Sequence, residues 1–243
     1  PFTVDSWRAC FDRSDASGLF EGFVRHEVEA PRGAGVRWGD KSPAYIRHVP
    51  LLLEHFPDAQ IIHIVRDVRD YCISINRAWG KDMRRAAFRW GQEVASAYRA
   101  CSTAPHRCLH VRYEELLRAP HLQMQKICGF LGTPFYDAMT RLGRPAEEFG
   151  DAAGRAEIVQ TNFNKFAGRL TPRQIEQIES LAFDTMHLLG LRPLYAARRR
   201  TMTSVEQQAR RLKDGLQLLI RSHSRFGVAG ALRFHASHRR FAD

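Results

Sequence analysis

A short apolar run that stops at a cluster of charges is the feature that most limits how this chain can fold. Residues 61–65 read IIHIV, and they are followed directly by RDVRD and then by the helical pattern YCISI. An apolar run of this length is typical of a strand that is covered on both faces of a parallel sheet. A chain that only had to turn would use Gly, Asn or Pro. The arginines and aspartates at this corner therefore require another explanation.

Segments with helical and strand-like patterns alternate along the chain. The apolar spacing predicts helices over residues 3–30, 45–56, 70–79, 82–101, 120–131 and 172–190, and strands over 61–65 and 109–113. Strands separated by helices of this length indicate parallel βαβ units. The expected fold class is therefore α/β, a three-layer arrangement of a parallel sheet with helices on both faces. Ligands of such sheets bind beyond the carboxyl ends of the strands, where Arg66 lies.

The positive charge of the chain is large and unevenly distributed. The net charge is +11 and the isoelectric point is near 10.0, so an anionic partner is needed, such as nucleic acid, a membrane surface or a phosphorylated cofactor. We expect the globular domain to occupy residues 1–195, and residues 196–243 to form a basic, amphipathic helical tail. This tail could lie weakly on an anionic membrane or on a partner, or it could dock on its own domain.

The rest of the composition argues against several classes of protein. No apolar run approaches the roughly 18 residues of a membrane span, so we expect the visible part to be soluble. The chain has five cysteines and no C-x-x-C pair, which argues against a disulfide or zinc framework and favours a reducing, cytoplasmic location. None of the 11 histidines belongs to an H-E-x-x-H motif, so no metal site is expected.

The charged corner suits the binding of an anion. A helix that begins after a strand offers unpaired backbone N–H groups and the positive end of its dipole. We expect Arg66, Ser74 and Arg77 to face the same space, where two guanidinium groups and one hydroxyl suit a phosphate dianion. The alternative is that the arginines and aspartates of the corner merely pair with one another at the surface.

A second group of polar residues lies in the segment WGDKSP, residues 38–43. Gly39 permits a tight backbone turn, and Pro43 favours an extended conformation at Ser42. Lys41 is thereby held on a short, ordered loop, from which it could reach an anionic group that is being transferred. The alternative is an ordinary solvated lysine at the surface.

Taken in order, the motifs of this chain resemble those of the sulfotransferase family. They are GDKSP, an amphipathic helix, FPDA, an apolar strand, VRDVRDYCIS, VRYEEL, KICGFLG and NKFAGRLT. The similarity runs from about Arg37 to Leu194 and is greatest to the branch of tyrosylprotein sulfotransferases and their bacterial relatives. It implies a P-loop-type α/β fold. It also implies transfer of a sulfuryl group from 3′-phosphoadenosine 5′-phosphosulfate (PAPS) to a hydroxyl acceptor, without a metal.

The resemblance implies roles for particular residues in binding the cofactor. Arg66 and Ser74 match the residues that bind its 3′-phosphate, and Arg77 would add to the phosphate site. Tyr113 and Lys165 match positions that contact the nucleotide. For these last two an alternative stays open, since Tyr113 could be a core aromatic residue and Lys165 a charge on a loop.

The catalytic groups that the resemblance implies are incomplete. Lys41 matches the lysine that stabilises the sulfuryl group or the bridging oxygen of the leaving group. The family opens with a strand and a phosphate-binding loop of the type RSGTT, which nothing in residues 1–36 matches. We expect that segment, and the glutamate base of the tyrosylprotein branch, to lie upstream of Pro1, so that this sequence is a fragment. In the small-molecule branch, the base is a histidine at the position that Pro43 occupies here.

The acceptor and two rival functions stay open at this point. A protein tyrosine, a carbohydrate, a lipid or a small alcohol would each supply the hydroxyl group. A P-loop nucleotide kinase would share the sheet and the anion site, but it needs the motif GxxxxGK[ST], which the sequence lacks. A nucleic-acid-binding protein would explain the charge, but basic residues interleaved with exposed aromatic residues are not evident.

Overall fold

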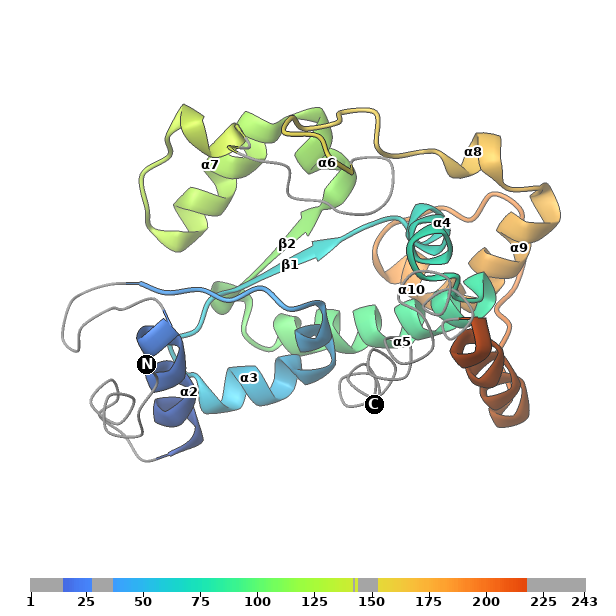
Figure 1. The fold of residues 1–243 in the computed structure, drawn as a ribbon, viewed down its shortest axis with the longest axis horizontal. Helices are drawn as coiled ribbons and strands as arrows, with labels where there is room; N and C mark the ends of the chain where they lie inside the picture. Colours follow the sequence, from blue (N-terminus) through green and yellow to red (C-terminus); the bar gives the residue numbers. More distant parts are fainter. Residues whose placement is uncertain (1–14, 28–36, 142, 144–152, 218–243) are drawn as a thin grey trace, which may run out of the picture. The chain divides into compact units, whose positions relative to one another are not determined.

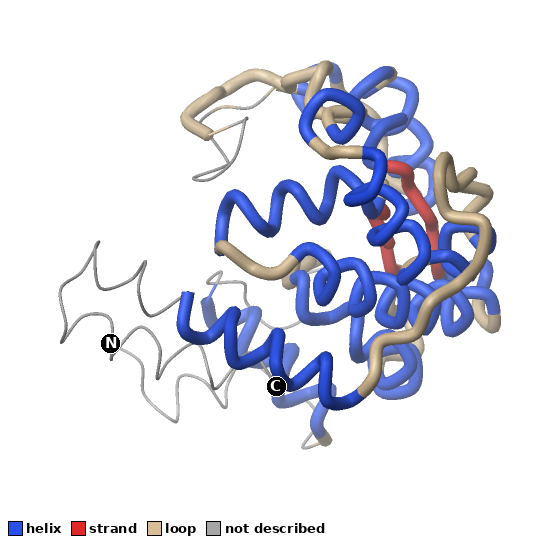
Figure 2. Tube along the Cα trace, turned by 90° about the vertical axis from the view of Figure 1, so that its right-hand side faces the viewer, coloured by secondary structure: helices blue, strands red, loops and turns tan. Residues whose placement is uncertain are grey.

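The structure is a computed structural model that describes residues 15–27, 37–141, 143 and 153–217. Figure 1 labels the helices and strands of these residues, and Figure 2 shows that most of the described chain is helical. The chain divides into two compact units. Unit 1 comprises residues 1–61 and 97–108, and unit 2 comprises residues 62–96 and 109–243.

The two strands pair in a sheet with the order β1-β2, and their arrows run in the same direction (Figure 1). β1 spans Ile61–Val65, as predicted, and β2 spans Cys108–Arg112, one residue earlier than predicted. The two faces of β1 differ in burial among the described residues. Ile64 is 50% exposed, whereas His63 is buried. Since successive side chains alternate between the faces of a strand, the described residues cover mainly the His63 face.

Unit 1 contains α2 (Ala16–Glu27), η1 (Pro43–His48), α3 (Val49–His55) and η2 (Pro105–Arg107). The helix predicted over residues 3–30 is described only at α2, and its other residues before 15 and after 27 lie outside the described part of the chain. The helix predicted over residues 45–56 is two elements, because Pro50 lies within it. Proline fits the first turn of a new helix but lacks the N–H group that a continuing helix needs.

The core of unit 1 joins α3 to the end of α5 and the start of β2. Its buried members are Val49, Ala97 and Cys101, with Ile46, Leu53, Ile61, Ala100 and Cys108 packed against them. Arg107 adds a polar tie, since its guanidinium group donates to the backbone carbonyls of Leu53 (3.1 Å), Ala59 (3.2 Å) and Phe56. The carbonyls at the end of α3, which have no partner within the helix, are thereby satisfied.

Unit 2 carries most of the helices. They are α4 (Val68–Trp79), α5 (Met83–Ser102, which continues into unit 1), α6 (Tyr113–Arg118), α7 (Pro120–Leu131), η3 (Asp137–Thr140), α8 (Phe166–Arg169), α9 (Pro172–Leu181) and α10 (Phe183–Leu188). The predictions for α5 and α7 are confirmed within one residue, as is the capping box of Thr171 and Gln174 at α9. Ile73, Phe166 and Ile175 form a buried cluster that joins α4, α8 and α9.

The single helix predicted over residues 172–190 is interrupted at Ala182, whose backbone leaves helical geometry with φ −108° and ψ 9°. The interruption lies where α5 approaches closely. Thr185 Oγ1 donates to the backbone oxygen of Gly91 at 2.7 Å, and a Cβ atom placed on Gly91 would lie 3.4 Å from the Cα atom of Ala182. Close packing against α5 therefore accompanies the break between α9 and α10.

The part of the basic tail that the structure describes includes a helix over residues 204–217, which docks on unit 2. Asp214 accepts hydrogen bonds from the backbone N–H of Asp82 at 2.7 Å and from Arg85 Nη1 at 2.9 Å. Arg210 Nη1 lies 2.7 Å from Asp82 Oδ2. These contacts fit the docked alternative for this helix, and residues 218–243 lie outside the described part of the chain.

The described helices and cysteines can be compared with what the composition predicts. None of the described helices combines the length and the apolar composition that crossing a membrane requires. Cys72, Cys101, Cys108 and Cys128 are free thiols, and Cys10 is not among the described residues.

Two histidines on neighbouring strands face each other within unit 2. The Nδ1 atoms of His63 on β1 and His110 on β2 lie 3.1 Å apart, so one ring donates a proton and the other accepts it. Burial, and then the neighbouring charge of His110, lower the pKa of His63 from 6.5 to about 4. Burial also lowers the pKa of His110. The pair is therefore stable only while at least one ring is neutral.

This pair predicts a loss of stability in mild acid. Below pH 6.5 an unfolded chain protonates His63, but the native protein resists protonation down to about pH 4. The native state thus binds fewer protons, and the free energy of unfolding should fall by about 3 kcal/mol as the pH decreases through this range. Urea denaturation between these pH values checks the effect. In His63→Leu the free energy of unfolding should depend less on pH than in the wild type. His121→Leu, at an exposed position, should keep the wild-type dependence on pH. The same dependence in all three proteins would contradict the prediction.

Candidate anion-binding site

The charged corner directly follows β1 and begins helix α4. Asp67 is the N-cap of α4, because its side chain accepts a hydrogen bond from the backbone N–H of Arg69 at 2.9 Å. The backbone N–H of Asp67 donates in turn to Glu114 Oε1 at 2.7 Å. The helix was predicted to start at Asp70 but starts at Val68. The aspartate that caps it satisfies N–H groups of the first turn that would otherwise lack partners.

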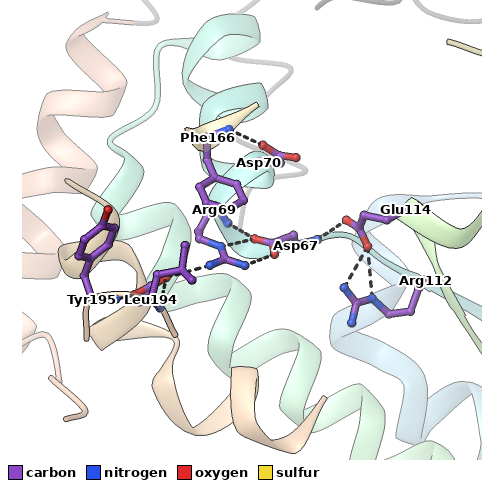
Figure 3. Close-up of polar contacts among 9 residues, drawn as sticks. Asp67, Arg69, Asp70, Arg112, Glu114, Phe166, Leu194 and Tyr195 are labelled. Carbon is purple, nitrogen blue, oxygen red and sulfur yellow. Dashed lines mark hydrogen bonds and ion pairs between the residues drawn. The ribbon is translucent and has the colours of Figure 1, made fainter. Parts of the chain in front are cut away.

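The guanidinium group of Arg69 lies buried between two carboxylates (Figure 3). Its Nη2 atom lies 2.6 Å from Asp67 Oδ2, and its Nη1 atom lies 2.9 Å from Glu179 Oε1. Burial alone would lower the pKa of Arg69, but the two carboxylates raise it above its usual value. The charges of the corner therefore do pair in part, although in the interior and not at the surface.

Glu179 on α9 is completely buried, and its carboxylate has a full set of donors. Besides Arg69, the backbone N–H groups of Leu194 and Tyr195, both labelled in Figure 3, donate to its two oxygens at 2.8 to 3.0 Å. The backbone N–H group of Ala196 also donates, at 3.1 Å. A buried carboxylate is costly unless it is paired in this way. Glu179 thus fixes the segment after α10 and the side chain of Arg69 at one point.

Glu114 connects the corner to the second strand. It is buried in the first turn of α6, which directly follows β2. One oxygen accepts from the backbone N–H of Asp67, and Oε2 lies 3.0 Å from Nη2 of Arg112, the last residue of β2. The chain segments that leave the carboxyl ends of β1 and β2 are therefore joined by this carboxylate.

Asp70 ties α4 to the turn before α8. Its side chain is completely buried, and Oδ1 accepts a hydrogen bond from the backbone N–H of Phe166 at 3.0 Å. Burial raises the pKa of Asp70, while the charge of Arg66 and the N–H groups of Phe166 and Asn164 oppose the shift. Asn164 has a φ of 61°, a left-handed conformation that asparagine tolerates better than most residues. The carboxyl group of Asp70 thus holds a turn with unusual backbone geometry.

Arg66 leaves the corner toward this turn. Its Nη2 atom donates to the backbone oxygen of Asn162 at 2.9 Å, and its guanidinium carbon lies 4.7 Å from the centre of the Tyr113 ring. Its Nε atom is buried and has no hydrogen-bond partner among the described residues. A buried donor without a partner is costly, so this atom is available to a bound acceptor.

Asn162 is the common partner of three residues that the sequence motifs single out. Its Nδ2 atom donates to the hydroxyl oxygen of Tyr113 at 2.9 Å, and its Oδ1 atom accepts from Lys165 Nζ. Arg66 bonds to its backbone oxygen. Sequence patterns missed Asn162 because a single asparagine in an irregular segment has no distinguishing spacing; its only signal is its position shortly before Lys165.

Ser74 and Arg77 lie on α4, beyond the corner. Ser74 is one helical turn after Asp70 and is half-buried, and Arg77 is nearly one turn further and exposed. Residues at this spacing lie on one side of a helix. Neither residue is hydrogen-bonded to Arg66 within the described residues, so the convergence of Arg66 and Ser74 on one ligand stays a prediction.

Lys41 belongs to unit 1 and is exposed on the loop before η1. Ser42 caps η1, since its hydroxyl accepts from the backbone N–H of Ala44 at 3.4 Å. Asp40 accepts a hydrogen bond from the hydroxyl group of Tyr45. These two contacts order the loop on either side of Lys41, in keeping with the short structured loop that the sequence predicts.

The group formed by Arg66, Lys165, Tyr113 and Asn162 has the chemistry of an anion site. Two cationic side chains and a phenol ring gather around Asn162, and the Nε–H group of Arg66 has no acceptor within the described part of the chain. Such donors suit the oxygens of a phosphate or sulfate, and the ring offers a face to a base or sugar. Among the residues described here, no cluster of three or more His, Cys, Asp or Glu side chains could hold a metal ion.

Comparison with known proteins supports the fold and the family of the chain. Residues 4–137 match the model of a family described as the sulfotransferase family. In structure, the chain is similar to a sulfotransferase domain from the curacin biosynthetic pathway, with a TM-score of 0.57 and 20% sequence identity, over 72% of this chain and 68% of that one. The predicted P-loop-type α/β fold class is thereby confirmed. The kinase and nucleic-acid-binding alternatives are not favoured by either comparison.

Curated relatives fall in one branch. The chain is 28% identical to protein-tyrosine sulfotransferase 1 of Danio rerio over 110 residues, which cover 41% of this chain and 30% of that protein. It is 29% identical to the protein-tyrosine sulfotransferase of Drosophila melanogaster over 132 residues, which cover 51% of this chain and 26% of that protein. The chain spans about half or less of the length of the curated relatives it matches.

The buried carboxylate of Glu179 provides a test of the frame around the corner. Glu179→Ala should lower the free energy of unfolding by about 3 kcal/mol, because it leaves Arg69 with one carboxylate and three backbone N–H groups without an acceptor. Glu176→Ala, at an exposed position of the same helix α9, is the matched control and should change stability by less than about 0.5 kcal/mol. Urea denaturation measures both variants. Indistinguishable midpoints would show that Glu179 does not support the corner.

Proposed function

The chain belongs to the sulfotransferase family, and on this premise we propose that it transfers a sulfuryl group from PAPS to a hydroxyl group. The observation that carries the proposal is the convergence of Arg66, Tyr113 and Lys165 on one point of unit 2. Two cations beside an aromatic ring fit a nucleotide that carries a separate phosphate. The family implies PAPS as the donor, and its 3′-phosphate is such a group.

Each predicted residue has a distinct task in this proposal. Arg66 and Lys165 hold the 3′-phosphate, and the buried Nε atom of Arg66, which lacks an acceptor among the described residues, supports this task. Ser74 completes the phosphate oxygens with its hydroxyl group. Arg77 adds positive charge along α4. Tyr113 borders the nucleotide with its ring, against which the guanidinium group of Arg66 already lies.

Catalysis in this proposal depends on alignment and on stabilising charge. PAPS supplies the sulfuryl group, which passes in line from the bridging phosphate oxygen to the acceptor oxygen as the old sulfur–oxygen bond breaks. Arg66 and Lys165 anchor the far end of the nucleotide, so that binding energy there fixes the position of the reacting end. The ammonium group of Lys41 stabilises the negative charge that develops on the oxygen that leaves.

We further propose that the acceptor is the hydroxyl group of a tyrosine in a protein. The curated relatives from Danio rerio and Drosophila melanogaster carry the name protein-tyrosine sulfotransferase, which supports an acceptor within a polypeptide. A phenol has a pKa near 10, so a base must accept its proton at neutral pH. Carbohydrate, lipid and small-alcohol acceptors are the competing substrates in an activity assay.

Loss of Arg66 tests the assignment of the phosphate site. In the full-length protein, Arg66→Ala should weaken the binding of adenosine 3′,5′-bisphosphate, the desulfated nucleotide, by at least about tenfold, because a guanidinium–phosphate contact is removed. Arg199→Ala removes the same charge from an exposed position and should leave the affinity unchanged. Calorimetry measures both dissociation constants. An Arg66→Ala protein that binds as tightly as the wild type would rule out this role.

Loss of Lys41 separates the reacting end from the binding end. Lys41→Met in the full-length protein should lower kcat by at least about a hundredfold with little change in nucleotide affinity, because the lysine acts on charge that develops during transfer. The assay uses PAPS labelled in its sulfuryl group and a peptide with one tyrosine, and the same peptide with phenylalanine is the blank. Lys126→Met on the exposed side of α7 is the control. Wild-type kcat in Lys41→Met would refute the catalytic role of Lys41. Equal labelling of the blank peptide would refute tyrosine as the acceptor.

A further inference from the structure

We infer that Asn162 is a positioning residue of the anion site, and that its two neutral oxygens, one in the backbone and one in the side chain, hold Arg66 and Lys165 together without cancelling their charge. This inference rests on the proposed function, because it assumes that a nucleotide phosphate binds beside these two cations. It adds a residue that lies outside the sequence motifs and gives a physical reason for its chemical type.

Asn162 is nearly buried, and its polar groups are hydrogen-bonded. Its exposed fraction is only 9%. Its backbone N–H donates to the oxygen of Val159 at 3.0 Å, and its backbone oxygen accepts from Arg66 at 2.9 Å. Its side chain bonds to the Tyr113 hydroxyl through Nδ2 and to Lys165 through Oδ1. Every polar group of the residue therefore has a partner, and its position is fixed by contacts in several directions.

The orientation of the amide follows from the two groups to which it bonds. A lysine ammonium group only donates hydrogen bonds, so the atom that faces Lys165 must be the amide oxygen. The amide nitrogen then faces Tyr113, whose hydroxyl oxygen accepts. This arrangement leaves the hydroxyl proton of Tyr113 free to donate elsewhere, since the bond from Asn162 uses only an oxygen lone pair. A flip of the amide would place its nitrogen against the ammonium group of Lys165, two donors facing each other, and would lose that bond.

The acceptors that Asn162 offers are neutral. Two cations held close together repel each other, and oxygens between them offset part of that repulsion. A carboxylate at this position would do so more strongly, but it would also neutralise one charge and repel a phosphate. Asp70 does not take over this role, because it is completely buried, burial raises its pKa, and its Oδ1 atom is bonded to Phe166. The two neutral oxygens of Asn162 thus keep the two cations in place and leave the site positive.

The decisive variant is Asn162→Asp, which keeps the shape and an acceptor for Lys165 but adds a negative charge. We expect its melting temperature to stay close to that of the wild type. Its affinity for adenosine 3′,5′-bisphosphate should fall by at least about tenfold, because the added carboxylate neutralises part of the positive charge of Arg66 and Lys165 and repels a phosphate. The deficit should shrink at high salt concentration, which screens charge but not a packing defect.

Gln125→Glu is the matched control, since it makes the same change of charge at an exposed position of α7 in the same unit. It should bind the nucleotide like the wild type. Calorimetry on the full-length proteins at low and high salt gives all of these values. A stable Asn162→Asp protein with wild-type affinity would overturn the inference, as would an equal loss of affinity in Gln125→Glu.

Two further results also decide the question. If Asn162→Asp does not fold, Asn162→Ala replaces it. The inference then requires weaker nucleotide binding, because Lys165 loses the side-chain oxygen that holds it beside Arg66, and wild-type affinity in Asn162→Ala overturns it. If the wild-type protein itself does not bind adenosine 3′,5′-bisphosphate, the proposed function fails and the inference fails with it. If the wild type binds the nucleotide and the Asn162 variants bind it with the same affinity, the proposed function survives and the inference alone is lost.

Discussion

The ion pair between Arg69 and the buried carboxylate of Glu179 is the contact on which the charged corner depends. Glu179 would be costly in the interior without donors, and it receives them from Arg69 and from the backbone after α10. Arg69 in turn holds Asp67, and Asp67 both caps α4 and bonds to Glu114. Each member satisfies a charge or a free N–H group of the next. The direction in which Arg66 leaves β1 follows from this chain of contacts, which involves residues from distant parts of the sequence.

The charged residues of the sequence RDVRD have two different roles in the structure. Asp67, Arg69 and Asp70 are buried and bonded to protein groups, so their task is structural. Arg66 is only partly buried and retains a donor without an acceptor among the described residues. The pairing hypothesis therefore holds for Asp67 and Arg69, and the anion-binding role of Arg66 stays a prediction. Arg69 pairs with Asp67 and with Glu179, and Asp70 accepts from the backbone of Phe166. Arg66 takes no part in this pairing and bonds to the backbone of Asn162.

Elements with strong local signals were predictable from the sequence, and those set by tertiary contacts were not. The apolar run of β1, the spacing of α5 and α7 and the capping box at Thr171 gave correct bounds within one residue. Pro50 is a local signal for a break in the helix predicted over residues 45–56, but the apolar spacing around it favoured one continuous helix. The break at Ala182 had no local signal, because it accompanies the approach of Gly91 on α5. In the candidate site, ordered motifs pointed to Arg66, Tyr113 and Lys165, but Asn162 becomes visible only through its contacts.

The docked helix over residues 204–217 has a practical meaning for anyone who shortens the chain. Its Asp214 and Arg210 complete the bonding around Asp82, whose other oxygen accepts from N–H groups in the first turn of α5. A version trimmed at residue 195 would expose that start of the longest described helix to water and strip Arg85 of its counter-charge. Poor expression or fraying of such a trimmed protein would then reflect the loss of the contacts that Arg210 and Asp214 make, and would say nothing about sulfuryl transfer.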